Sequence, residues 1–159
     1  MEILWQELTN GLPDAQQLER VVIRLIAAVL VGAIVGYERE RAGKPAGLRT
    51  HMLVSLGTCV LVVAGSAYGM SSDGLSRVIQ GIATGIGFIG TGSILKIDTE
   101  HRVHGLTTAA GIWITAAIGV TVGLGMLGLS IAAAIMTVIV LAVLRRFESS
   151  KEETTLSKE

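Results

Sequence analysis

The sequence is poor in charged, aromatic and crosslinking residues. Of its 159 residues, 16% are charged, 4% are aromatic and one is cysteine. The single cysteine, Cys59, excludes an intramolecular disulfide. The formal net charge is zero, so the composition indicates no nucleic-acid partner. The sequence also has no Ser/His/Asp arrangement, no phosphate loop after a strand and no Cys/His cluster, so we expect neither enzyme activity nor a cofactor.

The most informative absence is that of charge between Gly105 and Leu144. At about 1.5 Å of rise per helical residue, this run is ~60 Å long, about twice the thickness of a bilayer core. A soluble fold of this size has little use for such a run. We therefore expect a membrane protein, with two spans in this run and a turn among the glycines in its middle.

The sequence is rich in hydrophobic residues, at 50%, and in glycine, with 20 residues. Membrane helices tolerate glycine because small residues allow close helix packing. Charged residues divide the apolar sequence into blocks, which predict an all-α fold: a polytopic membrane bundle of about five transmembrane helices. The expected spans are residues 21–37, 50–72, 78–95, 107–122 and 124–144.

Most of the 13 lysines and arginines lie at one side of these spans, in loops 38–50 and 96–104 and at the C-terminal end. Cytoplasmic loops carry an excess of Lys and Arg, so we expect the N-terminus outside and the C-terminus in the cytoplasm. The predicted organisation is a periplasmic or interfacial segment at 1–17, a transmembrane domain at 18–146 and a disordered cytoplasmic tail at 147–159.

Arg24 is a charge inside the first predicted span. An arginine there costs on the order of a few kcal/mol unless it is paired or reaches the interface. One interpretation is an interfacial anchor that extends outward to water. The other is an inward-facing cation paired with Glu19, Asp73 or a partner protein.

The segment between the first two spans alternates in charge. One interpretation is a solvated loop that sets the topology and contacts anionic lipid. The other is a folded polar cap, in which Glu38 and Arg49 order the cytoplasmic ends of the helices. The functional candidates in this cytoplasmic cap are Glu38, Arg39, Arg49 and Thr50.

Glycine is unusually frequent in the third predicted span. Gly81 and Gly85 have the spacing that favours close helix packing. The alternative is a broken or thinned helix whose exposed carbonyls line a polar cavity. The candidates for this helix or cavity are Gly85, Gly87, Gly90, Thr91, Gly92 and Ser93, with Thr107 and Thr108 at the start of the fourth span.

A metal site has little support in the sequence. His101 and His104 lie three residues apart in a polar loop, which is weak evidence. Magnesium prefers oxygen ligands, and no carboxylate lies inside a predicted span. We therefore predict no metal ligands and no carboxylate-lined cation path through the bilayer.

Three blocks of residues, in this order and at this spacing, resemble the MgtC/SapB family of bacterial inner-membrane proteins. The blocks are 32–40 with 46–50, Arg77 with 85–92, and 105–110 with Trp113 and Gly119. The resemblance runs over nearly the whole hydrophobic part of the chain. The family's motif positions correspond here to Glu38, Arg39, Gly47, Leu48, Arg49, Thr50, Gly87, Gly90, Gly92, Thr107 and Thr108.

The resemblance implies a multi-pass protein of the bacterial inner membrane, linked to magnesium limitation or acid stress. It implies action by binding other membrane proteins, including the rotary ATP synthase, rather than by carrying magnesium. It also implies a short form, since longer members continue into a soluble C-terminal domain. We expect a non-enzymatic regulator in the lipid bilayer, which forms a homodimer or higher oligomer through its glycine faces. The alternatives are a small ion or solute transporter with its site at the third span, and a lipid-interacting scaffold.

Overall fold

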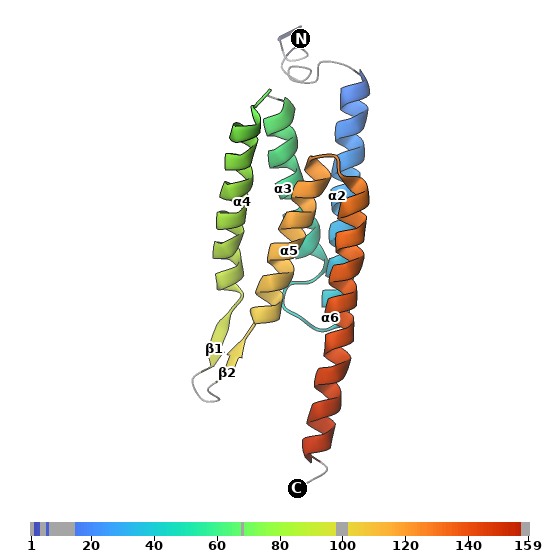
Figure 1. Ribbon diagram of the computed structural model, residues 1–159, viewed down its shortest axis with the longest axis vertical. Helices are drawn as coiled ribbons and strands as arrows, with labels where there is room; N and C mark the ends of the chain where they lie inside the picture. Colours follow the sequence, from blue (N-terminus) through green and yellow to red (C-terminus); the bar gives the residue numbers. More distant parts are fainter. Residues whose placement is uncertain (1, 4–5, 7–14, 68, 98–101, 157–159) are drawn as a thin grey trace.

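Five long helices form most of the part of the chain that the structure describes. The computed structural model describes residues 2, 3, 6, 15–67, 69–97 and 102–156. The helices run alternately up and down in one elongated bundle (Figure 1). Their bounds are α2 (Ala15–Arg41), α3 (Leu48–Ala67), α4 (Ser72–Gly92), α5 (Leu106–Gly123) and α6 (Leu127–Leu156). The predicted all-α architecture is confirmed, and each helix contains most of one predicted apolar block.

A short β-hairpin between α4 and α5 was not predicted. Strand β1 (Leu95–Ile97) pairs antiparallel with β2 (Arg102–His104), and Lys96 lies opposite Val103. Strands of three residues are too short to show the alternation of apolar and polar residues on which a strand prediction depends. The intervening residues 98–101, which include His101, lie outside the described residues.

The C-terminal segment corrects another expectation. Helix α6 continues to Leu156, whereas the sequence predicts a disordered tail from residue 147. Extending an existing helix adds one hydrogen bond for each residue that is fixed, so a polar segment can stay helical where it could not start a helix. Most of the predicted N-terminal segment, 1–17, lies outside the described residues.

Three helices end in the same way, with a glycine in the left-handed region. Gly43, Gly69 and Gly125 have φ of 67°, 70° and 82° and follow α2, α3 and α5. After α2, the Gly43 N–H donates to the Glu40 carbonyl and the Lys44 N–H donates to the Arg39 carbonyl. This is the Schellman pattern, and it satisfies carbonyls that the helix leaves free. Gly125 lies in the predicted turn between the last two spans, which is confirmed.

Helices α3 and α5 lie at the centre of the bundle and cross closely. A Cβ atom at Gly119 of α5 would collide with the Thr58 hydroxyl and the Ser55 carbonyl of α3. On the other side of α3, a Cβ atom at Gly36 of α2 would lie 2.8 Å from the Leu48 Cα. Glycine at both positions therefore allows the neighbouring helices to approach closely.

The outer surface of the bundle is largely apolar. On α6, for example, Ile131, Ile135 and Ile139 are about half exposed, and Phe88 on α4 is 84% exposed. A water-soluble monomer rarely carries such extensive apolar patches. By length and composition, two helices in the described part of the chain, α3 and α5, could cross a membrane. The apolar part of α6, Leu127–Val143, is slightly shorter.

Candidate functional site

One end of the bundle carries the loop between α2 and α3 (residues 42–47) and the β1–β2 hairpin (Figure 1). We call it the loop end; the predicted topology places it in the cytoplasm. A cluster of buried polar side chains lies next to it, formed by Glu38, Arg39, His51 and Ser55. It contains two of the four residues predicted for the cytoplasmic cap.

Glu38 and Arg39 form a buried ion pair. Arg39 is 1% exposed, and its Nε and Nη2 atoms both donate to Oε2 of Glu38. A buried charge is tolerated only when it is paired and hydrogen-bonded, which this arrangement achieves. In an isolated helix, neighbouring residues do not face one another, so this pairing could not be predicted from helical spacing.

His51 of α3 packs beside this pair, across from Gly111 of α5. Its Nδ1 atom lies 2.9 Å from the Gly47 carbonyl oxygen. A Cβ atom at Gly111 would lie 3.5 Å from His51 Nε2 and 3.9 Å from Arg39 Cδ, so glycine leaves the space that both side chains use. The cluster therefore joins α2, α3 and α5.

Two atoms of this cluster have no hydrogen-bond partner in the described part of the chain. They are His51 Nε2 and Ser55 Oγ, which lie one helical turn apart in completely buried residues. Neither residue was a candidate from the sequence. The sequence feature that could have identified them is their spacing: His51 and Ser55 lie four residues apart, on one face of an otherwise uncharged span.

The start of α3 is capped by Glu40, a residue that was not a candidate from the sequence. The Leu48 N–H donates to Oε2 of Glu40 at 2.8 Å, so a carboxylate caps the positive end of the helix. Arg49 is exposed in the first turn of α3, and Thr50 is half-buried behind it. The loop before α3 is therefore folded against the start of that helix through Glu40.

A pocket of about 260 Å³ lies between the α2–α3 loop and the start of α5. Lys44 lines it from the loop, Ser93 from the end of α4, and Thr107 and Thr108 from α5. The structure thus brings three of the predicted site residues together with a lysine that was not predicted. None of the residues that line this pocket is acidic.

The glycine-rich helix α4 is continuous from Ser72 to Gly92, so the alternative interpretation of a broken helix is wrong. Its hydroxyls bond within the helix: Thr91 Oγ1 donates to the Gly87 carbonyl at 2.9 Å. Gly90 faces Ala109 of α5 at van der Waals distance. At the other glycines between residues 81 and 92, an added Cβ would meet no atom of the described chain within 4 Å; they are Gly81, Gly85, Gly87 and Gly92.

The groove beside these glycines is apolar. It lies between α3 and α4 and is lined mainly by leucine, isoleucine, valine and glycine, with Thr58 as its one hydroxyl residue. It is therefore not the polar cavity that the transporter interpretation requires at this helix.

Arg24 points toward protein, as the second interpretation expected, but among the described residues it pairs with neither Glu19 nor Asp73. Its Nη1 atom donates to the Gly123 carbonyl at 2.9 Å, at the C-terminal end of α5. Its guanidinium also lies against Gly125 in the following turn. A cation is favourable there because a helix C-terminus carries partial negative charge. Arg24 therefore fastens α2 to α5 without an acidic partner in the described chain.

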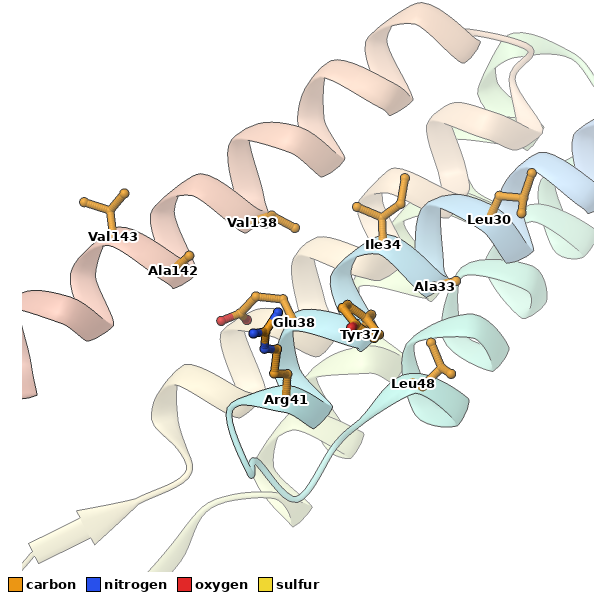
Figure 2. A pocket seen from close by; sticks show the side chains of 10 residues that line it. All are labelled: Leu30, Ala33, Ile34, Tyr37, Glu38, Arg41, Leu48, Val138, Ala142 and Val143. Atoms are coloured by element: carbon orange, nitrogen blue, oxygen red, sulfur yellow. The ribbon is translucent and has the colours of Figure 1, made fainter.

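A second groove runs between α2 and α6 (Figure 2). Its walls are apolar, with Leu30 and Ile34 on α2 facing Val138 on α6. Glu38 and Arg41, three residues apart on α2, line its end nearest the loop end. This groove connects the polar cluster with the apolar outer surface.

The described residues contain no group of three or more His, Cys, Asp or Glu side chains that could hold a metal ion. Of the two histidines considered from the sequence, His104 lines the pocket beside α5. His101 lies outside the described residues.

With this geometry established, comparison with known proteins identifies the family. The sequence profile of the MgtC family matches residues 25–150, most of the chain. The chain belongs to the MgtC family. The resemblance that three blocks of residues indicated is confirmed, and the matched region includes the polar cluster, the pocket beside α5 and the glycine face of α4.

Three relatives illustrate the similarity of this MgtC-family chain. Protein SrpB of Synechococcus elongatus is 43% identical over 136 residues, which cover 79% of this chain and 75% of SrpB. The putative magnesium transporter YhiD of Escherichia coli K12 is 45% identical over 130 residues, which cover 77% of this chain and 59% of YhiD. Protein MgtC of Salmonella typhimurium is 37% identical over 138 residues, which cover 87% of this chain and 58% of MgtC.

The chain therefore spans three quarters of SrpB but less than two thirds of YhiD and MgtC. No solved structure matches it significantly.

Proposed function

We propose that this MgtC-family protein is a non-enzymatic, multi-pass protein of the bacterial inner membrane that binds and regulates other membrane proteins. In this proposal all five helices cross the membrane, with the N-terminus outside and the C-terminus in the cytoplasm. The apolar outer surface of the bundle and the excess of basic residues at the loop end support this arrangement.

The observation that carries the proposal is the open glycine face of α4. Gly81 and Gly85 lie on an unbroken helix at the edge of the bundle, and an added Cβ at either would meet no other atom of the described chain within 4 Å. Inside a membrane, helices associate where small residues allow their backbones to approach. A face of this kind is suited to the helix of another membrane protein or of a second copy of this chain.

The link to magnesium limitation or acid stress comes from the family. The name of YhiD refers to magnesium transport, and the family resemblance implies regulation of membrane proteins such as the ATP synthase. We propose the same setting for this chain, with the loop end as its sensing surface.

Site-specific photo-crosslinking in cells tests the proposal. A photoreactive phenylalanine at Phe88, which is 84% exposed on α4, should crosslink to a membrane protein in cells grown with little magnesium. The same group at Ile135 on α6, which is 49% exposed, is the matched control. The substitution Gly85→Leu should abolish the Phe88 crosslink and the effect of the protein on ATP synthesis by inverted membrane vesicles. Equal crosslinking from both positions, or an unchanged crosslink in Gly85→Leu, would contradict the proposal.

Transport is the second candidate, and the buried polar cluster is the observation that favours it. His51 Nε2 and Ser55 Oγ are buried without a partner in the described chain, beside the Glu38–Arg39 pair. Polar groups inside a membrane bundle often mark a pathway. The test is the flux of magnesium and protons into sealed liposomes, with wild type compared with Glu38→Gln and His51→Gln. Flux that both substitutions abolish would establish transport; flux no greater than in empty liposomes would exclude it for these ions.

A further inference from the structure

Helix α5 begins at the loop end without a cap of its own. Its N-cap residue is Gly105, at φ 95°, which has no side chain to accept a hydrogen bond from the first turn. The first turn also contains no acidic residue. The first backbone N–H groups of a helix lack internal acceptors and carry partial positive charge. In a helix of 18 residues, this end attracts an anion.

The neighbouring helix α3 shows how this chain satisfies the same requirement elsewhere. Helix α3 also begins at the loop end, and the Glu40 carboxylate accepts a hydrogen bond from its Leu48 N–H. Helix α3 therefore has an anion supplied by the chain itself. No acidic side chain lines the pocket at the start of α5. A carboxylate is thus present at the start of α3 and absent from the pocket at the start of α5.

A second and independent observation concerns Thr108. This side chain is 2% exposed, yet it lines the pocket at the start of α5. Its hydroxyl makes no hydrogen bond within the described part of the chain, unlike that of Thr115, which donates to the Gly111 carbonyl at 2.8 Å. A polar ligand in the pocket would give this hydroxyl a hydrogen-bond partner.

Lys44 supplies the charge that such a ligand needs. It lies across the pocket from Thr107 and Thr108, on the loop that the Gly43 turn holds in place. A lysine ammonium, hydroxyl donors and the N–H groups of a helix end form a common environment for phosphate groups in proteins.

We propose that this pocket, formed by Lys44, Ser93, Thr107, Thr108 and the N-terminus of α5, binds a phosphate-type oxyanion. The Lys44 ammonium neutralises the charge of the anion. The first N–H groups of α5 and the Thr108 hydroxyl donate hydrogen bonds to its oxygens. The anion occupies the place that the Glu40 carboxylate occupies at α3. Its source is either a soluble phosphate compound or the headgroup of an anionic phospholipid, since the loop end lies where either could reach it. This site does not depend on the regulatory function proposed above.

Two binding measurements on the full-length protein test this site and distinguish the sources. The first measures binding of inorganic phosphate to protein purified in a non-ionic detergent, by equilibrium dialysis with labelled phosphate. The second measures binding of a labelled phosphatidylglycerol to protein in nanodiscs of phosphatidylcholine. Each compares wild type with Lys44→Gln, Lys44→Arg and Thr108→Val. Lys151→Gln removes the same charge from the distant part of α6 and is the matched control.

We expect Lys44→Gln and Thr108→Val each to weaken binding of one of the two probes at least about tenfold. Lys44→Arg should retain most of the affinity, and Lys151→Gln should bind like wild type. A loss seen only with phosphate identifies a soluble ligand, and a loss seen only with phosphatidylglycerol identifies a headgroup. Thermal melting checks that each variant is folded; Lys44 is exposed and valine has the shape of threonine, so both should be. The site is overturned if neither probe binds to wild type, or if both variants bind as well as Lys151→Gln.

Discussion

The α3–α5 crossing and the outer face of α4 are both rich in glycine, but the structure uses them in opposite ways. At the crossing, a Cβ atom at Gly119 would collide with Thr58 and Ser55, and one at Gly123 would lie 2.7 Å from Val62 Cβ. On α4, a Cβ atom at Gly81 or Gly85 would meet no atom of the described chain within 4 Å. Both pairs are four residues apart in the sequence. The spacing of glycines therefore identifies a face that allows close approach, and only the surrounding helices show whether that face is already occupied.

The difference also assigns different roles to the two faces. The occupied face holds the bundle together, since it lets the central helices approach to backbone contact. At the open face, an added Cβ at Gly81 or Gly85 would meet no atom of the described chain within 4 Å, and this is the face to which we propose that a partner binds. Variants should separate these roles, because changes at the crossing should affect stability and changes on α4 should affect association.

The largest effect is expected for Gly119→Ala. The added methyl group overlaps with the Thr58 hydroxyl and the Ser55 carbonyl, so α3 and α5 must move apart. Overpacking of this kind costs about 1–3 kcal/mol, and we expect the upper part of that range because backbone atoms are involved. The free energy of unfolding in mixed micelles, measured by titration with a denaturing detergent, checks this. A change below about 0.5 kcal/mol would show that the crossing is less tight than described.

Arg24→Ala should come next. It removes the charged hydrogen bond to the Gly123 carbonyl and the cation at the end of α5, and leaves that carbonyl partly buried. Hydrogen bonds to charged groups contribute about 1.5–3 kcal/mol, so we expect a loss of about 2 kcal/mol. Arg20→Ala, one turn earlier in α2 and exposed, is the control and should change stability by less than about 0.5 kcal/mol. If both variants lost the same free energy of unfolding, the cause would be the removal of a positive charge from α2 and not the loss of the Arg24–Gly123 contact.

Glu40→Gln should have a smaller effect on stability. It acts at the loop end, where α3 begins. Glutamine keeps an oxygen that can accept from the Leu48 N–H but removes the negative charge beside the α3 N-terminus. Charge at a helix end contributes about 0.3–1 kcal/mol, and we expect a loss within that range that decreases at high salt. Unfolding measured at two ionic strengths tests this. A loss that does not depend on salt would indicate a steric cause.

The smallest effect on stability is expected for Gly85→Ala, which is the same substitution as at Gly119 but on the open face. Nothing lies within 4 Å of the added methyl group, and alanine favours a helix over glycine by about 0.5–1 kcal/mol in water. Stability in the same detergent titration should stay unchanged or rise slightly. A loss as large as that of Gly119→Ala would mean that α4 packs more tightly in the membrane than the isolated chain indicates.

Much of the fold was predictable because it depends on local chemistry. Long uncharged runs must be helical in a bilayer, since every backbone polar group needs an internal partner there. The charges at residues 38–49 therefore separated α2 from α3, and the glycines near Gly125 marked the last turn. The hairpin and the helical part of the tail were missed, because three-residue strands and polar helix extensions leave little pattern in a sequence.

The candidate site was only partly predictable. Glu38, Arg39, Thr107 and Thr108 were recognised as positions of interest from their place in the family motifs. Their partners were not, since His51 packs on Arg39 and Lys44 lies across from Thr108 only because α2, α3 and α5 meet at one end. Such contacts join residues far apart in the chain, and no local spacing encodes them.

Composition and the order of residues thus establish that this chain forms a bundle of apolar helices, where those helices turn, and to which family it belongs. Which glycine face is occupied, which acidic residue caps a helix and where Arg24 points depend on how the helices pack. Helix formation is governed by hydrogen bonds within four residues along the chain. Packing is governed by the shapes of neighbouring helices, and two glycine faces with the same spacing can therefore have different neighbours.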